Sequence, residues 1–189
     1  TVDDIITMSP QMEDIKQRIP LIADTDSSVL IYGETGTGKE LVAESIHTAS
    51  KRAGRRFVAQ NCAAIPGNLL ESILFGTKKG SYTGAENKPG LFEIANGGTL
   101  FLDEINSMEM NVQAKILKAI EEKQVVRLGG YEPIKTDIKV ISAVNERPMD
   151  CVKAGKLRED LFYRLSVVQV NIPPLRERRD DILYMASRF

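Results

Sequence analysis

The 189-residue sequence predicts an α/β fold with a mostly parallel sheet. Two patterns predict it. Short apolar runs rich in β-branched or aromatic residues alternate with segments whose apolar residues recur at helical spacing. In addition, a glycine-rich loop stands between one of these runs and the helical segment that follows it. This order is typical of domains that bind a phosphate group at the end of a strand.

Composition is ordinary for a soluble globular domain, with 42% hydrophobic and 27% charged residues. The net charge of −1 argues against nucleic-acid binding as the main activity. Cys62 and Cys151 have neither a disulfide framework nor metal-ligand spacing. No apolar run approaches the roughly 20 residues of a membrane span, and there is no signal peptide. We expect an excised domain of a cytoplasmic protein.

The expected elements follow the apolar pattern along the chain. Strands are predicted at residues 29–32, 57–59, 99–102, 138–143 and 167–170. Helices are predicted where apolar residues recur at helical spacing, and these residues would form the helix faces that pack against the core. They are Val42, Ile46 and Ala49, then Leu69, Leu70, Ile73 and Leu74, then Val112, Ile116 and Ile120.

Two segments depart from this pattern. Residues 76–90 contain too many glycines for a helix interior. Gly129 and Gly130 stand between two short apolar runs, which predicts a β-hairpin with a glycine turn. Pro173 and Pro174 are expected to end the last strand, and a new helix begins after them.

A phosphate-binding loop of the Walker A type follows the first expected strand. Its residues are Gly33, Glu34, Thr35, Gly36, Thr37, Gly38 and Lys39. Glycines let the backbone N–H groups point inward at the phosphates, Lys39 supplies a positive charge, and the helix N-terminus adds a favourable dipole. Glu40 follows the lysine, where Ser or Thr usually ligates magnesium.

A second strand ends in two carboxylates, Asp103 and Glu104, as a Walker B strand does. Together with the phosphate loop, this arrangement predicts that Asp103 lies near Mg²⁺, with Glu104 contacting the ion through water. Glu104 is then placed to polarise an attacking water. We therefore expect ATP hydrolysis with Mg²⁺ rather than nucleotide binding alone.

At these motifs the sequence resembles the AAA+ domains of sigma-54-dependent activators, the bacterial enhancer-binding proteins. Phosphate loops of that family commonly end in Gly-Lys-Glu, as this one does at Glu40. The family's Gly-Ala-Phe-Thr-Gly-Ala loop, which contacts sigma-54, is matched at four of six positions, by Gly80, Ser81, Tyr82, Thr83, Gly84 and Ala85. Residues 61–64, 74–76 and 173–178 are similar to the family as well, and residues 74–77 together with the phosphate-loop region resemble regulators of arginine utilisation.

The resemblance implies further roles for single residues. Asn61 is similar to a switch asparagine that hydrogen-bonds Glu104, and Asn145 to a sensor at the end of a strand. Arg158 and Arg164 are similar to the pair that reaches into the neighbouring subunit's site. The loop with Gly129 and Gly130 resembles the family's second pore loop.

The resemblance also implies a P-loop NTPase of the AAA+ type, a three-layer α/β/α sandwich. Residues 1–175 would form the large subdomain, the sigma-54 interaction domain, and residues 176–189 the start of a truncated helical lid. The implied protein is a homo-oligomeric ring, a hexamer, that acts on the sigma-54 RNA polymerase holoenzyme. It would bind DNA through a separate domain outside this chain and would not contact a membrane.

Alternatives of other classes remain open at this point. The client of the ATPase could differ, as in a chaperone-like or helicase-loading AAA+ protein. A nucleotide-gated interaction module would bind ATP without turnover, and a nucleotide kinase would need an acceptor site. His47 is interpreted as a residue on a helix face, and the basic cluster of Lys51, Arg52, Arg55 and Arg56 as a solvated helix end and loop.

Overall fold

A five-stranded parallel sheet forms the centre of the molecule. The computed structural model describes residues 1–81 and 83–187. The strand order is β2-β5-β8-β1-β9, and every neighbouring pair is parallel. The strands are β1 (Val29–Tyr32), β2 (Phe57–Asn61), β5 (Thr99–Asp103), β8 (Lys139–Val144) and β9 (Val168–Asn171). Each overlaps a strand expected from the apolar runs, so the predicted sheet is confirmed.

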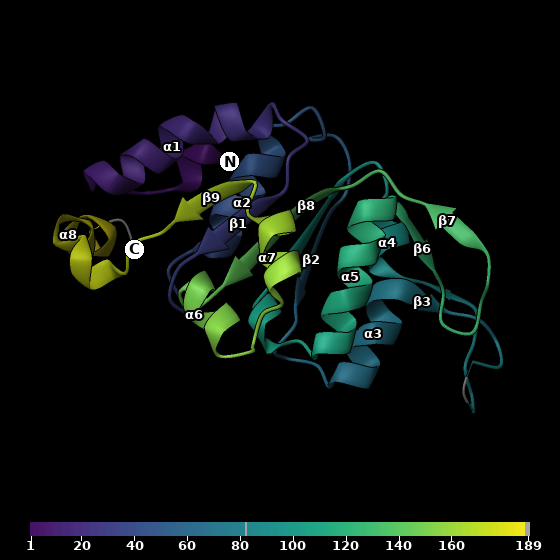
Figure 1. Cartoon of the computed structure of the whole chain (residues 1–189). Helices are drawn as coiled ribbons and strands as arrows, with labels where there is room; N and C mark the ends of the chain where they lie inside the picture. Colours follow the sequence, from purple (N-terminus) through teal and green to yellow (C-terminus); the bar gives the residue numbers. More distant parts are fainter. Residues whose placement is uncertain (82, 188–189) are drawn as a thin grey trace.

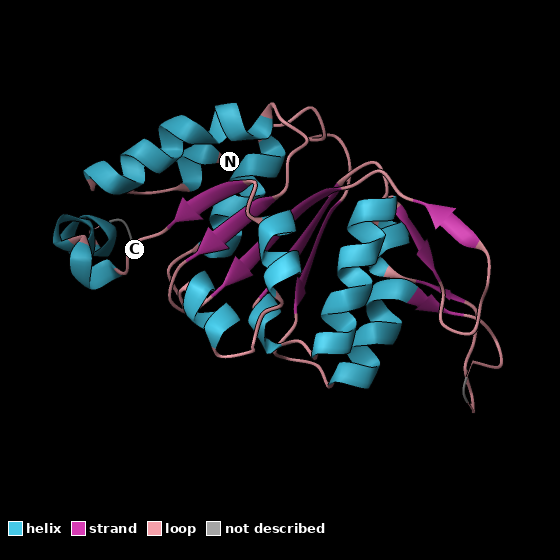
Figure 2. Cartoon of the chain, viewed as in Figure 1, coloured by secondary structure: helices cyan, strands magenta, loops and turns pink. Residues whose placement is uncertain are grey.

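Helices cover both faces of this sheet, as Figures 1 and 2 show. One face packs against α1 (Pro10–Ala23) and α2 (Lys39–Thr48). The other packs against α3 (Gly67–Phe75), α4 (Leu91–Ile94), α5 (Met110–Glu122), α6 (Pro148–Lys153) and α7 (Glu159–Leu165). Successive strand residues serve opposite faces: Leu30 belongs to one core, Val29 and Ile31 to the other. The predicted three-layer sandwich is confirmed.

The remaining elements are short or lie at the edges. They are η1 (Val2–Asp4), η2 (Ile105–Ser107), η3 (Leu175–Glu177) and α8 (Arg179–Ala186). The helix expected after the two prolines is therefore present as α8. In the part of the chain that the structure describes, no helix is long and apolar enough to cross a bilayer.

Two small antiparallel pairs extend from the sheet on the side of α3 and α5 (Figure 1). The predicted hairpin is β6 (Gln124–Val126) with β7 (Pro133–Lys135), joined by residues 127–132. The pair β3 (Gly76–Thr77) with β4 (Lys88–Pro89) was not predicted. A Cβ at Gly76 would lie 2.6 Å from the Gly90 nitrogen, so glycine permits this close approach. The pair closes the base of a loop, residues 78–87, that protrudes from the body (Figure 1).

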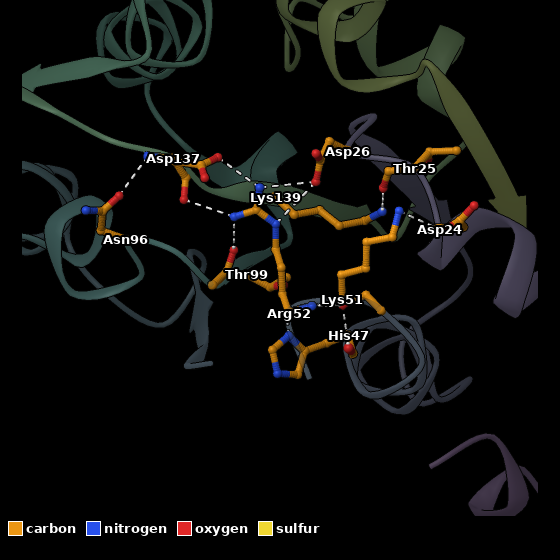
Figure 3. A network of polar contacts seen from close by, with 12 residues as sticks. Asp24, Thr25, Asp26, His47, Lys51, Arg52, Asn96, Thr99, Asp137 and Lys139 are labelled. Atoms are coloured by element: carbon orange, nitrogen blue, oxygen red, sulfur yellow. Dashed lines mark hydrogen bonds and ion pairs between the residues drawn. The ribbon is translucent and has the colours of Figure 1, made fainter. Parts of the chain in front are cut away.

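A network of charged groups connects the loops at the amino-terminal ends of the parallel strands, the amino edge of the sheet (Figure 3). Arg52 is only 13% exposed at its side chain and contacts Asp26 at 3.1 Å and Asp137 at 2.8 Å. The interpretation of Arg52 as a solvated residue was therefore wrong, because two carboxylates from distant loops surround its guanidinium. The buried Lys139 ammonium donates to the backbone oxygen of Ile22 at 2.9 Å, near the end of α1.

Candidate active site

The phosphate loop joins β1 to α2 at the carboxyl-terminal ends of the parallel strands, the carboxyl edge of the sheet. Its first residue is anchored to the neighbouring strand, because Gly33 N donates to the Val144 oxygen at 3.3 Å. A Cβ at Gly33 would lie 2.6 Å from Thr37 Oγ1 and 3.2 Å from Ile172 Cβ, so glycine avoids a crowded position there. Gly36 and Gly38 have φ of +81° and +94°, which favours glycine. These constraints explain the glycine spacing seen in the sequence.

Backbone donors in this loop are available to an anion. Among the described residues, the N–H groups of Gly36 and Gly38 donate to no protein acceptor. Lys39 is 6% exposed, and its Nζ donates to the oxygens of Gly33 at 3.0 Å and Glu34 at 3.2 Å. Two of the three ammonium hydrogens are thus used to close the loop, which leaves the third for a ligand. With the N-terminus of α2 beside it, the loop forms a cradle that fits a phosphate.

Asp103 and Glu104 stand at the same edge, two strands away from β1. Asp103 Oδ1 accepts from Glu104 N at 2.9 Å. Glu104 adopts φ +55°, a left-handed conformation that is rare for a non-glycine residue and typical of functional sites. Mg²⁺ in nucleotide sites is usually held by one or two carboxylates with phosphate oxygens and waters. The Asp103 carboxylate fits this donor set, and the contact of Glu104 with the ion through water stays a prediction. Glu40 is exposed at the start of α2.

The two expected asparagines flank the carboxylates. Asn61 lies beside Asp103 in the β2–β5 register. Its Oδ1 accepts from the nitrogens of Ala63 at 2.9 Å and Ala64 at 3.2 Å, and no bond joins it to Glu104 among the described residues. The predicted Asn61–Glu104 bond, which would need Asn61 Nδ2 as the donor to the carboxylate, is therefore absent among the described residues. The switch role itself remains a prediction.

Asn145 directly follows β8, the strand that lies between β1 and β5. It therefore stands between the phosphate loop and the carboxylates. Its Oδ1 accepts from Asn106 Nδ2 at 2.9 Å. The position agrees with a sensor, and Asn106 is a partner that the sequence did not reveal.

Two arginines after the last strand hold the phosphate loop from outside. Arg176 makes two hydrogen bonds to the Glu34 carboxylate, at 2.6 and 2.7 Å. This contact lowers the pKa of Glu34 below its usual range. Arg178 is buried and donates through Nη2 to the Thr37 oxygen at 3.2 Å. Neither contact was predicted; the sequence signal was only that both arginines follow a pair of prolines.

A buried carboxylate ties this segment to the beginning of the chain. Asp181 in α8 is 0% exposed and lies 3.4 Å from Arg178 Nη1. It also accepts from Thr7 Oγ1 at 2.8 Å, from Met8 N at 2.6 Å and from Ser9 N at 3.1 Å. The phosphate loop, the start of α8 and the segment before α1 are therefore linked by one polar network.

The two arginines expected to act across a subunit interface lie at opposite ends of α7. Arg158 precedes the helix and bonds Asp160 at 2.8 and 3.0 Å. Arg164, in the last turn, lines a small cavity with Asp26 and Asp137 at the amino edge of the sheet. The structure therefore does not bring Arg164 to the phosphate loop of its own chain, which is at the carboxyl edge.

The expected sigma-54-contacting residues lie in the protruding loop. Gly80 and Gly84 have φ of +91° and +83°, Thr83 is exposed and Ala85 is buried. Tyr82 lies outside the described residues. Glycine at these two positions permits the left-handed backbone angles that other residues rarely adopt.

This loop rests on the hairpin loop of residues 127–132. Lys78 N donates to the Leu128 oxygen at 2.9 Å, and Lys78 Nζ contacts Glu132 at 2.8 Å. A Cβ at Gly129 would lie 2.5 Å from that of Ser81, so glycine permits the contact between the loops. The two loops are therefore in direct contact through both backbone and side chains.

Comparisons with known proteins agree with this geometry. Residues 5–171 match the family model described as the sigma-54 interaction domain. The chain is 53% identical over 189 residues to transcriptional activator RocR of Bacillus subtilis, covering 100% of this chain and 41% of the relative. It is 50% identical over 187 residues to DNA-binding transcriptional regulator NtrC of Escherichia coli, covering 98% of this chain and 40% of the relative. The chain thus spans about two fifths of the length of these relatives.

Solved structures show the same fold. The crystal structure of NtrX from Brucella abortus in complex with ATP has a TM-score of 0.90 at 40% identity, covering 97% of this chain and 42% of that one. The P-loop NTPase domain of a sigma-54 transport activator from E. coli has a TM-score of 0.60 at 18% identity, covering 90% of this chain and 99% of that one. The second likeness concerns the fold alone, which is that of a P-loop NTPase.

Proposed function

The chain belongs to the sigma-54 interaction domain family, and from this premise we propose that it is an ATPase. It couples ATP hydrolysis to remodelling of the closed complex of sigma-54 RNA polymerase, and so activates transcription. The observation that carries the proposal is the phosphate cradle around buried Lys39, at the same sheet edge as Asp103 and Glu104. The ATP complex solved for NtrX supports ATP as the nucleotide.

Each residue at this edge has a defined task in hydrolysis. The N–H groups of the phosphate loop and Lys39 bind the phosphates. Asp103 would hold Mg²⁺, which would supply positive charge to the phosphate oxygens. Glu104 accepts hydrogen bonds from the attacking water and orients it, with a proton passing to its carboxylate as the water attacks. Asn145 supplies a donor beside the phosphate.

The site is completed by a neighbouring subunit. Arg164 lies at the amino edge of the sheet, whereas Lys39 lies at the carboxyl edge. If Arg164 stabilises the transferring phosphate, it therefore acts on the site of another chain. A closed head-to-tail ring, such as a hexamer, gives every site one such arginine, and Arg158, at the other end of α7, would face the same interface.

Turnover should depend on Glu104 and nucleotide binding on Lys39. We expect Glu104→Gln to keep ATP affinity while hydrolysis falls by ~10²-fold or more, because the amide no longer accepts a proton. Lys39→Ala should weaken ATP binding itself. The measurement is phosphate release together with nucleotide titration, on the assembled protein. Equal hydrolysis by the wild type and Glu104→Gln would refute the role given to Glu104, whereas no hydrolysis by the assembled wild type would favour an interaction module without turnover.

The protruding loop should couple hydrolysis to the client without taking part in hydrolysis. Thr83 is exposed on it, far along the chain from the phosphate loop. In the whole protein we expect Thr83→Ala to keep its ATPase rate and to lose open-complex formation with sigma-54 polymerase. Retained activation by this variant would point to a different client.

A further inference from the structure

Asn106 is a buried residue whose side-chain amide connects the turn after Glu104 to the side chain of Asn145. It lies in η2, the single 3-10 turn that begins directly after Glu104, and it is 8% exposed. The turn is closed by Ser107 N, which donates to the Glu104 oxygen at 2.9 Å. Asn106 Nδ2 donates to Asn145 Oδ1 at 2.9 Å. A short rigid turn thus joins the backbone of Glu104 to the side chain of Asn145.

This bond matters for the nucleotide site because Asn145 lies next to the strand residue that anchors the phosphate loop. Asn145 follows Val144, whose oxygen accepts from Gly33 N, the first nitrogen of the phosphate loop. A carboxamide has an oxygen that accepts and an NH₂ group that donates, so the partner of one end decides where the other end points. Because Asn106 occupies the oxygen of Asn145, the NH₂ group remains available. No protein acceptor within the described residues takes a bond from it.

A phosphate oxygen accepts hydrogen bonds, so only the NH₂ end of Asn145 is useful beside it. A rotation of the amide by a half turn would present an oxygen to the phosphate and would repel it. Asn106 itself keeps a buried Oδ1 with no partner among the described residues. A half-satisfied buried amide costs free energy relative to an apolar side chain. Stability alone therefore gives no reason for an asparagine at position 106. The hydrogen bond that Asn106 Nδ2 donates to Asn145 does give a reason.

We propose that Asn106 is a positioning residue for hydrolysis: its Nδ2 donor fixes the Asn145 carboxamide with the NH₂ group facing the phosphate. The inference rests on the proposed ATPase function and adds a specific residue to it. Because Asn106 shares a turn with Glu104, the same contact sets the distance between the residue that orients the water and the one that senses the phosphate.

The test is Asn106→Asp in the whole protein, a change of nearly equal size that replaces the donor with an acceptor. The Asn145 amide must then turn its NH₂ group toward the new carboxylate and its oxygen toward the phosphate. We expect kcat to fall by ~10²-fold, as on loss of one donor to developing charge, while the KM for ATP and the affinity for ADP stay near their wild-type values. Asn106→Ala releases the amide without reversing it and should lower kcat less. Ser107→Ala, in the same turn and exposed, is the matched control and should leave kcat unchanged.

A double-mutant cycle with Asn145→Ala separates positioning from a general structural role. If Asn106 acts through Asn145, adding Asn106→Asp to Asn145→Ala causes no further fall in kcat. Additive losses, or wild-type kcat in Asn106→Asp, overturn the inference. If Asn106→Asp does not fold, Asn106→Ala enters the same cycle and the same criteria apply. Wild-type hydrolysis that does not depend on Glu104 refutes the proposed function, whereas Glu104-dependent hydrolysis that is indifferent to Asn106 refutes only this inference.

Discussion

Removing the Asp181 carboxylate should destabilise the fold and weaken the nucleotide site together. The side chain is 0% exposed and accepts hydrogen bonds from Thr7 Oγ1, Met8 N and Ser9 N, all within 3.1 Å. It also lies 3.4 Å from Arg178, whose other nitrogen bonds the Thr37 oxygen of the phosphate loop. Asp181→Ala deletes the acceptor shared by all these donors and leaves Arg178 as a buried, unpaired charge.

The size of the effect follows from these contacts. Breaking a buried charge pair by removing one partner costs about 3–5 kcal/mol. A hydrogen bond to a charged group contributes ~1.5–3 kcal/mol, but the bonds to one carboxylate are not additive. We therefore expect the free energy of unfolding to fall by about 4 kcal/mol, a large share of the roughly 5–15 kcal/mol typical of a domain. For a chain of this length, the midpoint of thermal unfolding should drop by ~10 °C.

The assay combines urea unfolding with ADP titration, and Asp180→Ala is the matched control. Asp180 occupies the preceding position in the first turn of α8 but is exposed. Asp181→Asn, which keeps one acceptor oxygen, should fall between Asp181→Ala and the wild type in stability. At a temperature where the variants are folded, Asp181→Ala should also bind ADP more weakly, because Arg178 no longer holds the phosphate loop. A loss of less than about 1 kcal/mol, equal to that of Asp180→Ala, would show that the network does not stabilise the fold.

Two further predictions address pH and assembly. Burial lowers the pKa of His47 below 6.5, so in the window just below that value the unfolded chain binds more protons than the folded one. The free energy of unfolding should therefore fall as pH drops through this window. In urea titrations at pH 8 and pH 5.5, His47→Gln should show a smaller fall than the wild type. An equal fall in both proteins would contradict the lowered pKa of His47. Mixing Lys39→Ala with Arg164→Ala, each inactive alone, should restore part of the ATPase activity, because some interfaces then pair an intact phosphate loop with an intact arginine. Co-assembly without any recovery of activity would exclude action of Arg164 across the interface.

Local patterns in the sequence predicted the backbone well. The apolar runs specify strands because a central parallel strand is buried on both faces and needs apolar side chains throughout. The glycines of the phosphate loop predicted its conformation, since Gly36 and Gly38 take backbone angles that other residues avoid. The two-residue strands β3 and β4 were missed, because their glycine and proline residues suggest a loop. Their pairing depends on a close approach between segments, which no periodicity reports.

The partners of polar side chains could not be predicted in the same way. Arg52 was expected to be solvated, but Asp26 and Asp137 reach it from loops that the sheet brings together. Asn61 was expected to bond Glu104, but among the described residues its side chain bonds only the backbone of the turn that follows it. A local pattern records whether a position is buried, whereas a hydrogen bond depends on which distant group arrives beside it.

The same distinction explains which parts of the candidate site were found. Lys39, Asp103 and Glu104 belong to motifs at the ends of predicted strands, so their positions in the sequence indicate where they lie in the fold. Asn106 and Arg178 do not, because their roles come from contacts with Asn145 and with the phosphate loop, 39 and 141 positions away. Such residues orient groups that would otherwise rotate or move. A site described from its motif alone therefore contains the groups that bind the nucleotide but lacks those that orient them. The Asn106 variants measure how much of the hydrolysis rate depends on this second set, and the Asp181 variants measure how much of the stability and of ADP binding does.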